Sequence, residues 1–557
     1  MSRRAELVAL GRRSQQVLLL SALTGAVVGL AVALFDWITA EVILDAVLHA
    51  PLALQAGAPL VGLGLAALSL RYVASVASGA TPASSDEYIK NFHEHDRRLA
   101  LRPVPGRILG AVATLGMGGA MGLEGPSIYI GASIGSVIQG RLARLFSRDD
   151  AKLLMVAGAA AGVAAIFKAP ATGAIFALEV PYQDDTARRM LLPALTGAAV
   201  SYVVFVAFAG TAPLLPVGGP APFDFRDLGG AALVGLLCGV GARGFALVLR
   251  RAKSAVTRLS APLRVAAAGC SLAALFGLSH LLFGAGLTLG PGYRTVAWAT
   301  DPTHSIGLVL GLLVLRAAAT VVTVGGGGVG GLFIPLVIEG ALLGRAVSGA
   351  FGNASSSLFS VVGIAAFLGA GYRSPLAGVM FVAESTGRPG FVVPALLASV
   401  VAQLVMGRLS VTPYQRAARA GHLEHRFDLP IAAALQADVL SVPPDATLAE
   451  FVSNHLLMAR QKSVPVLDGR HYVGMVRAED LVAIPRDEWA RTTVKEILRD
   501  DLPVGHTDWR LREAVLTMEK ADIDVMAVVD AGSSFVGVVS TTEILNLDEI
   551  LDQAGDA

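Results

Sequence analysis

Several uninterrupted apolar runs are long enough to cross a lipid bilayer, and they limit the chain to a membrane fold. Residues 17–34 read VLLLSALTGAVVGLAVAL, and comparable runs cover 51–70, 228–249 and 305–322. A helix needs about 20 apolar residues to span the hydrocarbon. Other apolar segments are shorter or are interrupted by Gly and Pro, which at membrane depth is typical of backbone that lines a cavity. With only 16% charged residues, the chain is predicted to be a multi-pass helical protein of the lipid bilayer.

The charge distribution predicts how the N-terminus is oriented in the membrane and argues against one class of partner. The first apolar run is preceded by Arg3, Arg4, Arg12 and Arg13. Basic residues beside a span favour the cytoplasmic side, so we expect a cytoplasmic N-terminus. We also expect the protein to lie in a plasma (inner) membrane. A formal net charge of +1 argues against nucleic acid as a partner.

The apolar part contains an internal duplication. The segment GMGGAMGLEGPSIYIGASIG (116–135) aligns without a gap on GGGGVGGLFIPLVIEGALLG (325–344), at an offset of 209 residues. A second pair, FKAPATGAIFALEV (167–180) and YRSPLAGVMFVAES (372–385), aligns at an offset of 205. Duplicated membrane folds commonly place their site where the two repeats meet, on broken helices near mid-membrane.

Within the first pair of segments, a lone acid occupies a predicted helix start. Glycines followed by Pro and an apolar run indicate helix N-termini near 122–126 and 331–335. Two such starts aimed at one point would offer free N–H groups and the positive ends of two helix dipoles to an anion. Partial charges would hold an anion weakly enough to release it. The carboxylate of Glu124 could occupy the same place and vacate it on protonation or movement; the alternative is a carboxylate that only caps its helix.

These segments resemble the CLC family of chloride channels and anion/proton exchangers. GLEGP, GLFIP and PATGAIFALEV are similar to three of its motifs in the same order. The resemblance implies an all-α polytopic membrane domain with an inverted-topology internal repeat, assembled as a homodimer with one pore per subunit. It also implies that Glu124 is the gating glutamate, that the backbone amides of Leu332 and Phe333 bind the central anion, and that the hydroxyl of Tyr414 lines the anion path. The expected substrate is chloride or another small monovalent anion.

Three positions depart from the family pattern. Gly79 stands where the family has an anion-binding serine, so selectivity for chloride is uncertain, although the backbone N–H at Gly79 remains. Leu123 replaces a basic residue before Glu124, which makes the outer mouth less positive. Val180 replaces the acid that passes protons from the inside in exchangers. We therefore predict a passive, glutamate-gated anion channel, with an anion/proton antiporter of the same family as the alternative.

The composition changes after residue 425. Charged residues become frequent, which predicts a soluble domain at 426–557 after a membrane domain at 1–425. Segments 464–481 and 526–545 repeat a strand–turn–strand–helix pattern. They resemble a tandem CBS (cystathionine β-synthase) pair, a smaller α/β cytoplasmic module with repeats at about 434–485 and 492–549.

The CBS pair leaves two functions open. In nucleotide-binding members a hydroxyl and an acid hold the ribose; here Ser540 and Glu543 occupy those positions in the second repeat, and Asp480 is the acid of the first repeat. An adenine nucleotide is one possible ligand, and an unliganded packing and dimerisation module is the other. We expect no cofactor to be required for transport.

Two unrelated classes of protein are disfavoured. Some intramembrane metalloproteases also carry CBS pairs, but they need HExxH on a helix to bind zinc. Neither FHEHD (His93, Glu94, His95) nor GHLEHR (His422, Glu424, His425) has that spacing. A cation transporter would need more acids within the spans than Glu124 and Glu339.

Overall fold

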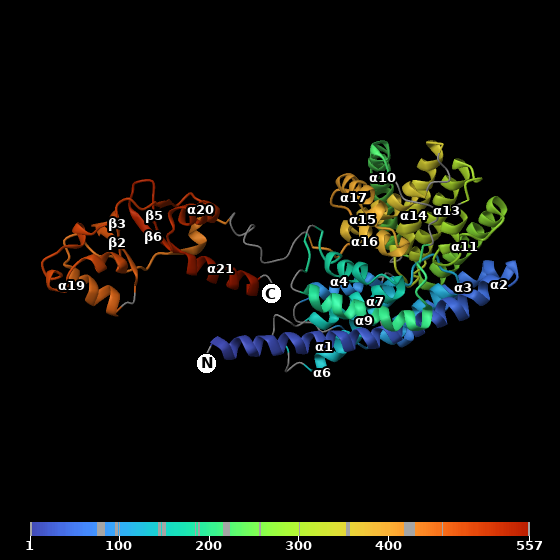
Figure 1. Cartoon of the computed structure of the whole chain (residues 1–557), viewed down its shortest axis with the longest axis horizontal. Helices are drawn as coiled ribbons and strands as arrows, with labels where there is room; N and C mark the ends of the chain where they lie inside the picture. Colours follow the sequence, from blue (N-terminus) through green and yellow to red (C-terminus); the bar gives the residue numbers. More distant parts are fainter. Residues whose placement is uncertain are drawn as a thin grey trace. The chain divides into compact units, whose positions relative to one another are not determined.

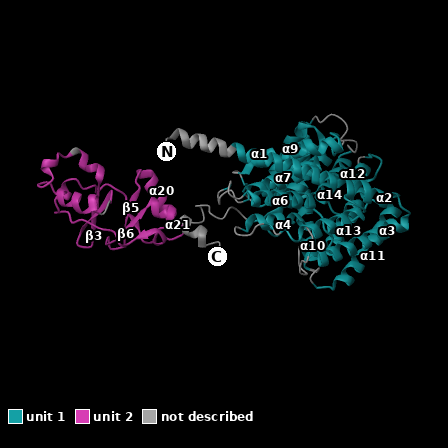
Figure 2. Ribbon diagram, turned by 90° about the horizontal axis from the view of Figure 1, so that it is seen from below, with its two compact units in different colours: residues 1–418 teal, residues 419–557 magenta. Residues whose placement is uncertain are grey.

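The chain folds into two compact units, Met1–Ala418 and Arg419–Ala557 (Figures 1 and 2). The boundary predicted at 425/426 falls among residues 417–428, outside the described residues. The computed structural model describes residues 3–74, 84–94, 99, 101–142, 146, 152–183, 185–187, 190–215, 223–255, 258–299, 301–352, 357–416, 429–458 and 461–554.

The first unit is helical throughout its regular structure. Two π-helical stretches, Trp37–Leu44 and Ser69–Val73, continue its first and third helices, and a 3₁₀ turn at Pro389–Phe391 precedes the last. The helices are α1 (Arg3–Asp36), α2 (Asp45–His49), α3 (Leu52–Leu68), α4 (Ser84–His93), α5 (Val104–Gly116), α6 (Glu124–Arg141), α7 (Leu153–Phe167), α8 (Pro170–Glu179), α9 (Leu191–Ala209), α10 (Phe225–Ala255), α11 (Ala261–Phe283), α12 (Tyr293–Ala299), α13 (Ile306–Gly325), α14 (Phe333–Ala350), α15 (Leu358–Tyr372), α16 (Pro375–Thr386) and α17 (Val392–Met406).

Membrane-length helices account for the long apolar runs. Within the described residues, eight helical segments are long and apolar enough to cross a bilayer. Four of them, Gln15–His49, Leu52–Val73, Phe225–Ser254 and Ile306–Gly325, correspond to the runs identified in the sequence. Many of their leucines and valines are exposed in the isolated chain, as lipid-facing side chains would be.

The internal duplication is confirmed by the backbone. Helices α6 and α14 begin and end at positions 209 apart, and α7 and α15 at positions 205 apart. Lys168 and Arg373, also 205 apart, end α7 and α15 in the same left-handed conformation, with φ of 52° and 53°. Because even these uncommon backbone angles recur, the two halves are copies of one structural unit.

Close helix contacts within each repeat depend on glycine. A Cβ on Gly131 of α6 would lie 1.9 Å from the carbonyl oxygen of Gly158 on α7, and one on Gly340 of α14 would lie 2.3 Å from that of Gly363 on α15. These distances exclude any side chain. Small residues at such positions let backbones pack closely where lipid supplies no hydrophobic driving force between helices.

The second unit is α/β and has two hairpins. Its elements are β1 (Leu435–Gln436), α19 (Leu448–Phe451), β2 (Ser463–Asp468), β3 (His471–Arg477), β4 (Gly505–His506), α20 (Leu511–Ala521), β5 (Val525–Val529), β6 (Phe535–Ser540) and α21 (Thr541–Ala554). One sheet has the order β1-β6-β5-β4, in which β4 and β5 are parallel and the other pairs antiparallel. The antiparallel pair β2-β3 forms the second sheet.

The strand pairing around the second hairpin is repeated around the first, where single bridges take the place of paired strands. Val442 pairs in parallel with Val466 of β2, as β4 pairs with β5, and Arg499 pairs in antiparallel fashion with Met475 of β3, as β1 pairs with β6. The antiparallel partner of each hairpin thus comes from the start of the other repeat, whereas the parallel partner comes from its own repeat. The two turns also meet, with an antiparallel bridge between His471 and Ser534. The repeats are therefore interlocked in one module.

Candidate anion site

Two helix N-termini are held side by side at the contact between the repeats. Gly122 lies just before α6, and Gly331 lies just before α14. Each glycine donates its N–H to the carbonyl of the other, with N···O distances of 2.9 and 2.8 Å. Since the two positions are equivalent in the repeats, this antiparallel bridge relates the halves by an approximate two-fold axis. It brings together the unpaired N–H groups and positive dipole ends of both helices.

Glu124, the first residue of α6, places its carboxylate across this contact. The Phe333 N–H at the start of α14 donates to Glu124 Oε1 at an N···O distance of 2.6 Å. The backbone N–H groups of Ile334 and of Glu124 itself also interact with the carboxylate. The side chain is fully buried, and among the residues that the structure describes its second oxygen, Oε2, has no hydrogen-bond partner. The carboxylate therefore sits as an anion would, on backbone amides of a helix start.

Glycine on both sides makes room for this carboxylate. A Cβ at Gly122 would come within 1.9 Å of Glu124 Oε2, and a Cβ at Gly331 within 2.0 Å of Oε1. Any other residue at either position would overlap the carboxylate. The glycines thus allow the backbone to approach a small negatively charged group closely.

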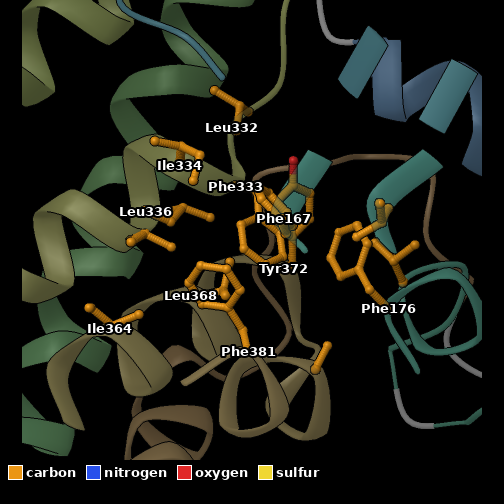
Figure 3. Close-up of a cluster of buried hydrophobic side chains, with 14 of the residues drawn as sticks. Phe167, Phe176, Leu332, Phe333, Ile334, Leu336, Ile364, Leu368, Tyr372 and Phe381 are labelled. Carbon is orange, nitrogen blue, oxygen red and sulfur yellow. The ribbon is translucent and has the colours of Figure 1, made fainter. Parts of the chain in front are cut away.

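Beside the site lies a buried aromatic cluster. The Phe333 ring packs against the rings of Phe167, Phe176 and Phe381, with centroid separations of 4.3, 5.2 and 5.0 Å (Figure 3). All four rings are at most 1% exposed. The cluster makes the surroundings of the site dry and apolar, which strengthens the hydrogen bonds of the backbone amides to a bound charge.

Tyr372 adds a hydroxyl that sequence reasoning missed. It ends α15, packs edge-to-face on Phe176 at 5.2 Å, and is 1% exposed. Its hydroxyl interacts with the Leu332 N–H and electrostatically with Glu124, and it lies 3.4 Å from the Ser85 hydroxyl on α4. The signal was present in the second aligned pair of segments, where Tyr372 falls opposite Phe167: one repeat carries a hydroxyl that the other lacks.

The other predicted anion ligands are placed as follows. Gly79 lies outside the described residues. Leu332 and Phe333 are consecutive residues at the start of α14. The Leu332 N–H interacts with the Tyr372 hydroxyl, and the Phe333 N–H donates to the Glu124 carboxylate. Tyr414 is half-buried, and the charged groups that act on its hydroxyl are Asp86 and Glu87 of α4. Sequence reasoning therefore located the helix starts and the acid, but not the tyrosine hydroxyl on Leu332.

Val180 follows α8 and is completely buried. Its carbonyl accepts a hydrogen bond from Gln415 Nε2 at 2.9 Å, and the same nitrogen donates to the Tyr372 carbonyl at 2.6 Å. The valine side chain cannot carry a proton, so this position offers only apolar packing and its backbone carbonyl.

Two further carboxylates form reciprocal caps between the repeats. Glu179 at the end of α8 accepts from the N–H groups of Leu376 and Ala377 at 3.2 and 2.9 Å. Glu384 on α16 accepts from those of Ala171 and Thr172 at 2.9 and 2.7 Å. Each carboxylate thus satisfies the first amides of the partner helix. This geometry supports the structural role predicted for Glu179.

In the second unit the tentative nucleotide residues form local caps. The Ser540 hydroxyl accepts from the Glu543 N–H at 3.2 Å, which brings these two residues together at the start of α21. Asp480 accepts from the Arg477 N–H at 2.8 Å and lies 3.7 Å from Arg499 Nη1. Both arrangements leave nucleotide binding a prediction.

Metal chemistry finds no support in the part of the chain that the structure describes, where no group of three or more His, Cys, Asp or Glu side chains could hold an ion. His93 and Glu94 belong to that part. His95, His422, Glu424 and His425 lie outside it.

The fold and the site together define a helical membrane protein with duplicated halves and a buried carboxylate on a helix N-terminus at their contact. The chain belongs to the voltage gated chloride channel family, whose sequence profile matches residues 61–407. CBS domains match at residues 431–487 and 494–549. The resemblance seen in the motifs and the predicted fold class are thereby confirmed.

Named relatives and solved structures agree with this assignment. The chain is 28% identical over 324 residues to proteins named H(+)/Cl(-) exchange transporter ClcA from Salmonella typhi and Citrobacter koseri, covering 55% of this chain and 67% of theirs. Its fold is similar to that of a slow cyanobacterial Cl⁻/H⁺ antiporter (TM-score 0.60, 22% identity, covering 70% of this chain and 94% of the other). It is also similar to a CLC-type fluoride/proton antiporter (TM-score 0.59, 24% identity, covering 75% and 100%).

Proposed function

We propose that this protein carries a small monovalent anion, in the first place chloride, across a membrane in exchange for protons, with Glu124 as the gate. The observation that carries the proposal is the Glu124 carboxylate on the Phe333 amide, at an N···O distance of 2.6 Å. A carboxylate and a chloride ion are both monovalent anions. They would compete for the same amides, so the anion can enter only when Glu124 leaves or becomes neutral.

Proton exchange follows from the same competition. A proton taken up by Glu124 removes the charge that holds it on the amides and frees the site for an anion. Return of the carboxylate then releases the proton and expels the anion. One group therefore links the two ions, and the names of the relatives, which are exchange transporters, favour this mode over the channel expected from the sequence.

A passive channel remains the second candidate because of one residue. Val180 occupies the position of the internal proton-carrying acid and cannot exchange a proton. In the channel mode, anions would pass whenever the Glu124 carboxylate leaves the site, with no proton moved in return. In either mode, the proposed assembly is a homodimer in the bilayer with both termini in the cytoplasm.

Flux measurements on the purified protein in liposomes test the proposal. In the exchange mode, a pH gradient alone drives uphill chloride uptake, and Glu124→Gln abolishes that uptake while passive chloride flux persists. In the channel mode, chloride flux occurs without uphill uptake, acid raises the flux, and Glu124→Gln is more open and insensitive to pH. If the wild-type protein moves no anion under either gradient, or if Glu124→Gln keeps the wild-type pH profile, the proposed function of this site is wrong.

A further inference from the structure

We infer that the hydroxyls of Tyr372 and Ser85 are direct ligands of the transported anion. This inference rests on the proposed function, and it concerns the hydroxyl donors of the site. The family resemblance gives that role to Tyr414 and to a serine that is replaced here by Gly79. The structure places two other hydroxyls at the helix start where the anion would bind.

The two hydroxyls lie next to each other, and one of them is beside the amide of Leu332. Tyr372 Oη interacts with the Leu332 N–H, and Ser85 Oγ lies 3.4 Å from Tyr372 Oη. Tyr372 and Ser85 are each 1% exposed, and they come from different helices, α15 and α4. The next amide along the chain, that of Phe333, is the one that binds Glu124. The tyrosine hydroxyl and the gating carboxylate thus lie at adjacent amides of one helix start, with the serine hydroxyl beside the tyrosine.

Departure of Glu124 would leave an incomplete anion site that this pair can complete. The N–H group of Phe333 would be released, and an anion on it would lie beside Tyr372, which already interacts electrostatically with the Glu124 carboxylate. The Tyr372 O–H can rotate to donate to the anion while its oxygen keeps the Leu332 N–H, since a phenol both donates and accepts. Ser85 can donate to the tyrosine oxygen or to the anion. Neutral donors bind an anion without the full positive charge that would prevent its release.

The tyrosine is held rigidly in this position. Its ring packs edge-to-face on Phe176 at 5.2 Å, and its backbone carbonyl accepts from Gln415 Nε2 at 2.6 Å. The hydroxyl points to the side of the aromatic cluster on which Leu332 lies (Figure 3). A donor fixed in advance loses little conformational freedom when it binds a ligand. Tyr414, by contrast, is only half-buried.

The alternative is that Tyr372 only caps the Leu332 amide. A cap would contribute to stability without affecting anion affinity. A hydrogen bond to a charged ligand contributes about 1.5–3 kcal/mol, which corresponds to an affinity change of roughly 10- to 150-fold.

The test measures chloride binding to full-length protein by titration calorimetry in a Glu124→Gln background, which removes the competing carboxylate. We expect Tyr372→Phe to weaken chloride binding at least about ten-fold and Ser85→Ala to weaken it by a smaller factor. Tyr88→Phe is the matched control: it removes another buried hydroxyl, which donates to the Ala177 carbonyl at 2.7 Å, and we expect its affinity to be unchanged.

Three results would overturn the inference. The first is unchanged chloride affinity in both Tyr372→Phe and Ser85→Ala. The second is a lower melting temperature in Tyr372→Phe with the chloride affinity of the Glu124→Gln background, and the third is a larger loss of chloride affinity in Tyr414→Phe than in Tyr372→Phe. If Tyr372→Phe does not fold, Ser85→Ala decides the question alone. Failure of the proposed function is distinguishable, because the protein would then lack chloride flux and chloride binding even with Tyr372 and Ser85 intact.

Discussion

Replacing Gly122 by alanine should open the gate without altering Glu124. The added methyl group would lie 1.9 Å from Glu124 Oε2 and 2.7 Å from its carboxyl carbon, and the three nearest atoms to it all belong to that carboxylate. An ordinary contact needs about 3.4 Å or more, so the carboxylate must withdraw by more than 1 Å and lose its 2.6 Å hydrogen bond to the Phe333 amide. A hydrogen bond to a charged group contributes about 1.5–3 kcal/mol. Its loss shifts the gate toward the open state roughly 10- to 150-fold.

Chloride flux into proteoliposomes, measured from acid to neutral pH, checks this prediction. Gly122→Ala should raise flux at neutral pH toward the acid value, because the charge no longer holds the gate closed. In a Glu124→Ala background the same substitution should have no effect, since no carboxylate is left to displace. Gly64→Ala, where a Cβ would meet nothing within 4 Å, controls for the loss of a glycine. A folded Gly122→Ala protein with wild-type flux and pH profile would refute the reasoning.

Three further predictions concern stability and the second unit. Glu384→Gln should lower the unfolding free energy by about 1.5–3 kcal/mol, since an amide cannot replace the charged acceptor of two backbone N–H groups; unchanged thermal unfolding in detergent would contradict the cap. Lys253→Met should cost about 3–5 kcal/mol, because the carboxylate of Asp86, 2.8 Å from Lys253 Nζ and 1% exposed, is left unpaired. Adding Asp86→Asn should recover much of that loss, and a double variant as unstable as the single one would exclude charge burial as the cause. If the second unit binds an adenine nucleotide, calorimetry should show heat with AMP, ADP or ATP that disappears in Ser540→Ala/Glu543→Ala; no heat in the wild type leaves packing as its function.

Local sequence patterns were sufficient for the fold class and for locating the acid at the helix start. Apolar length gave the spans, the two aligned segments gave the duplication, and the glycines around Glu124 gave the helix starts, because each of these depends on neighbouring residues. The match between Tyr372 and Leu332 could not be found in this way. It requires the end of α15 to meet the start of α14 in space, and residues 40 apart in the sequence reveal such a contact only after folding.

The site exists because the two copies of the repeat have diverged at two positions. The counterpart of Glu124 in the second repeat is Phe333, and the counterpart of Tyr372 in the first is Phe167. A symmetric pair of glutamates would place two carboxylates at one contact, where they would repel each other, and a symmetric pair of phenylalanines would leave no gate. With one acid, the Phe333 N–H becomes the donor that holds the Glu124 carboxylate across the approximate two-fold axis. Duplication supplies the two facing helix starts, and the loss of symmetry decides which of them gates and which binds.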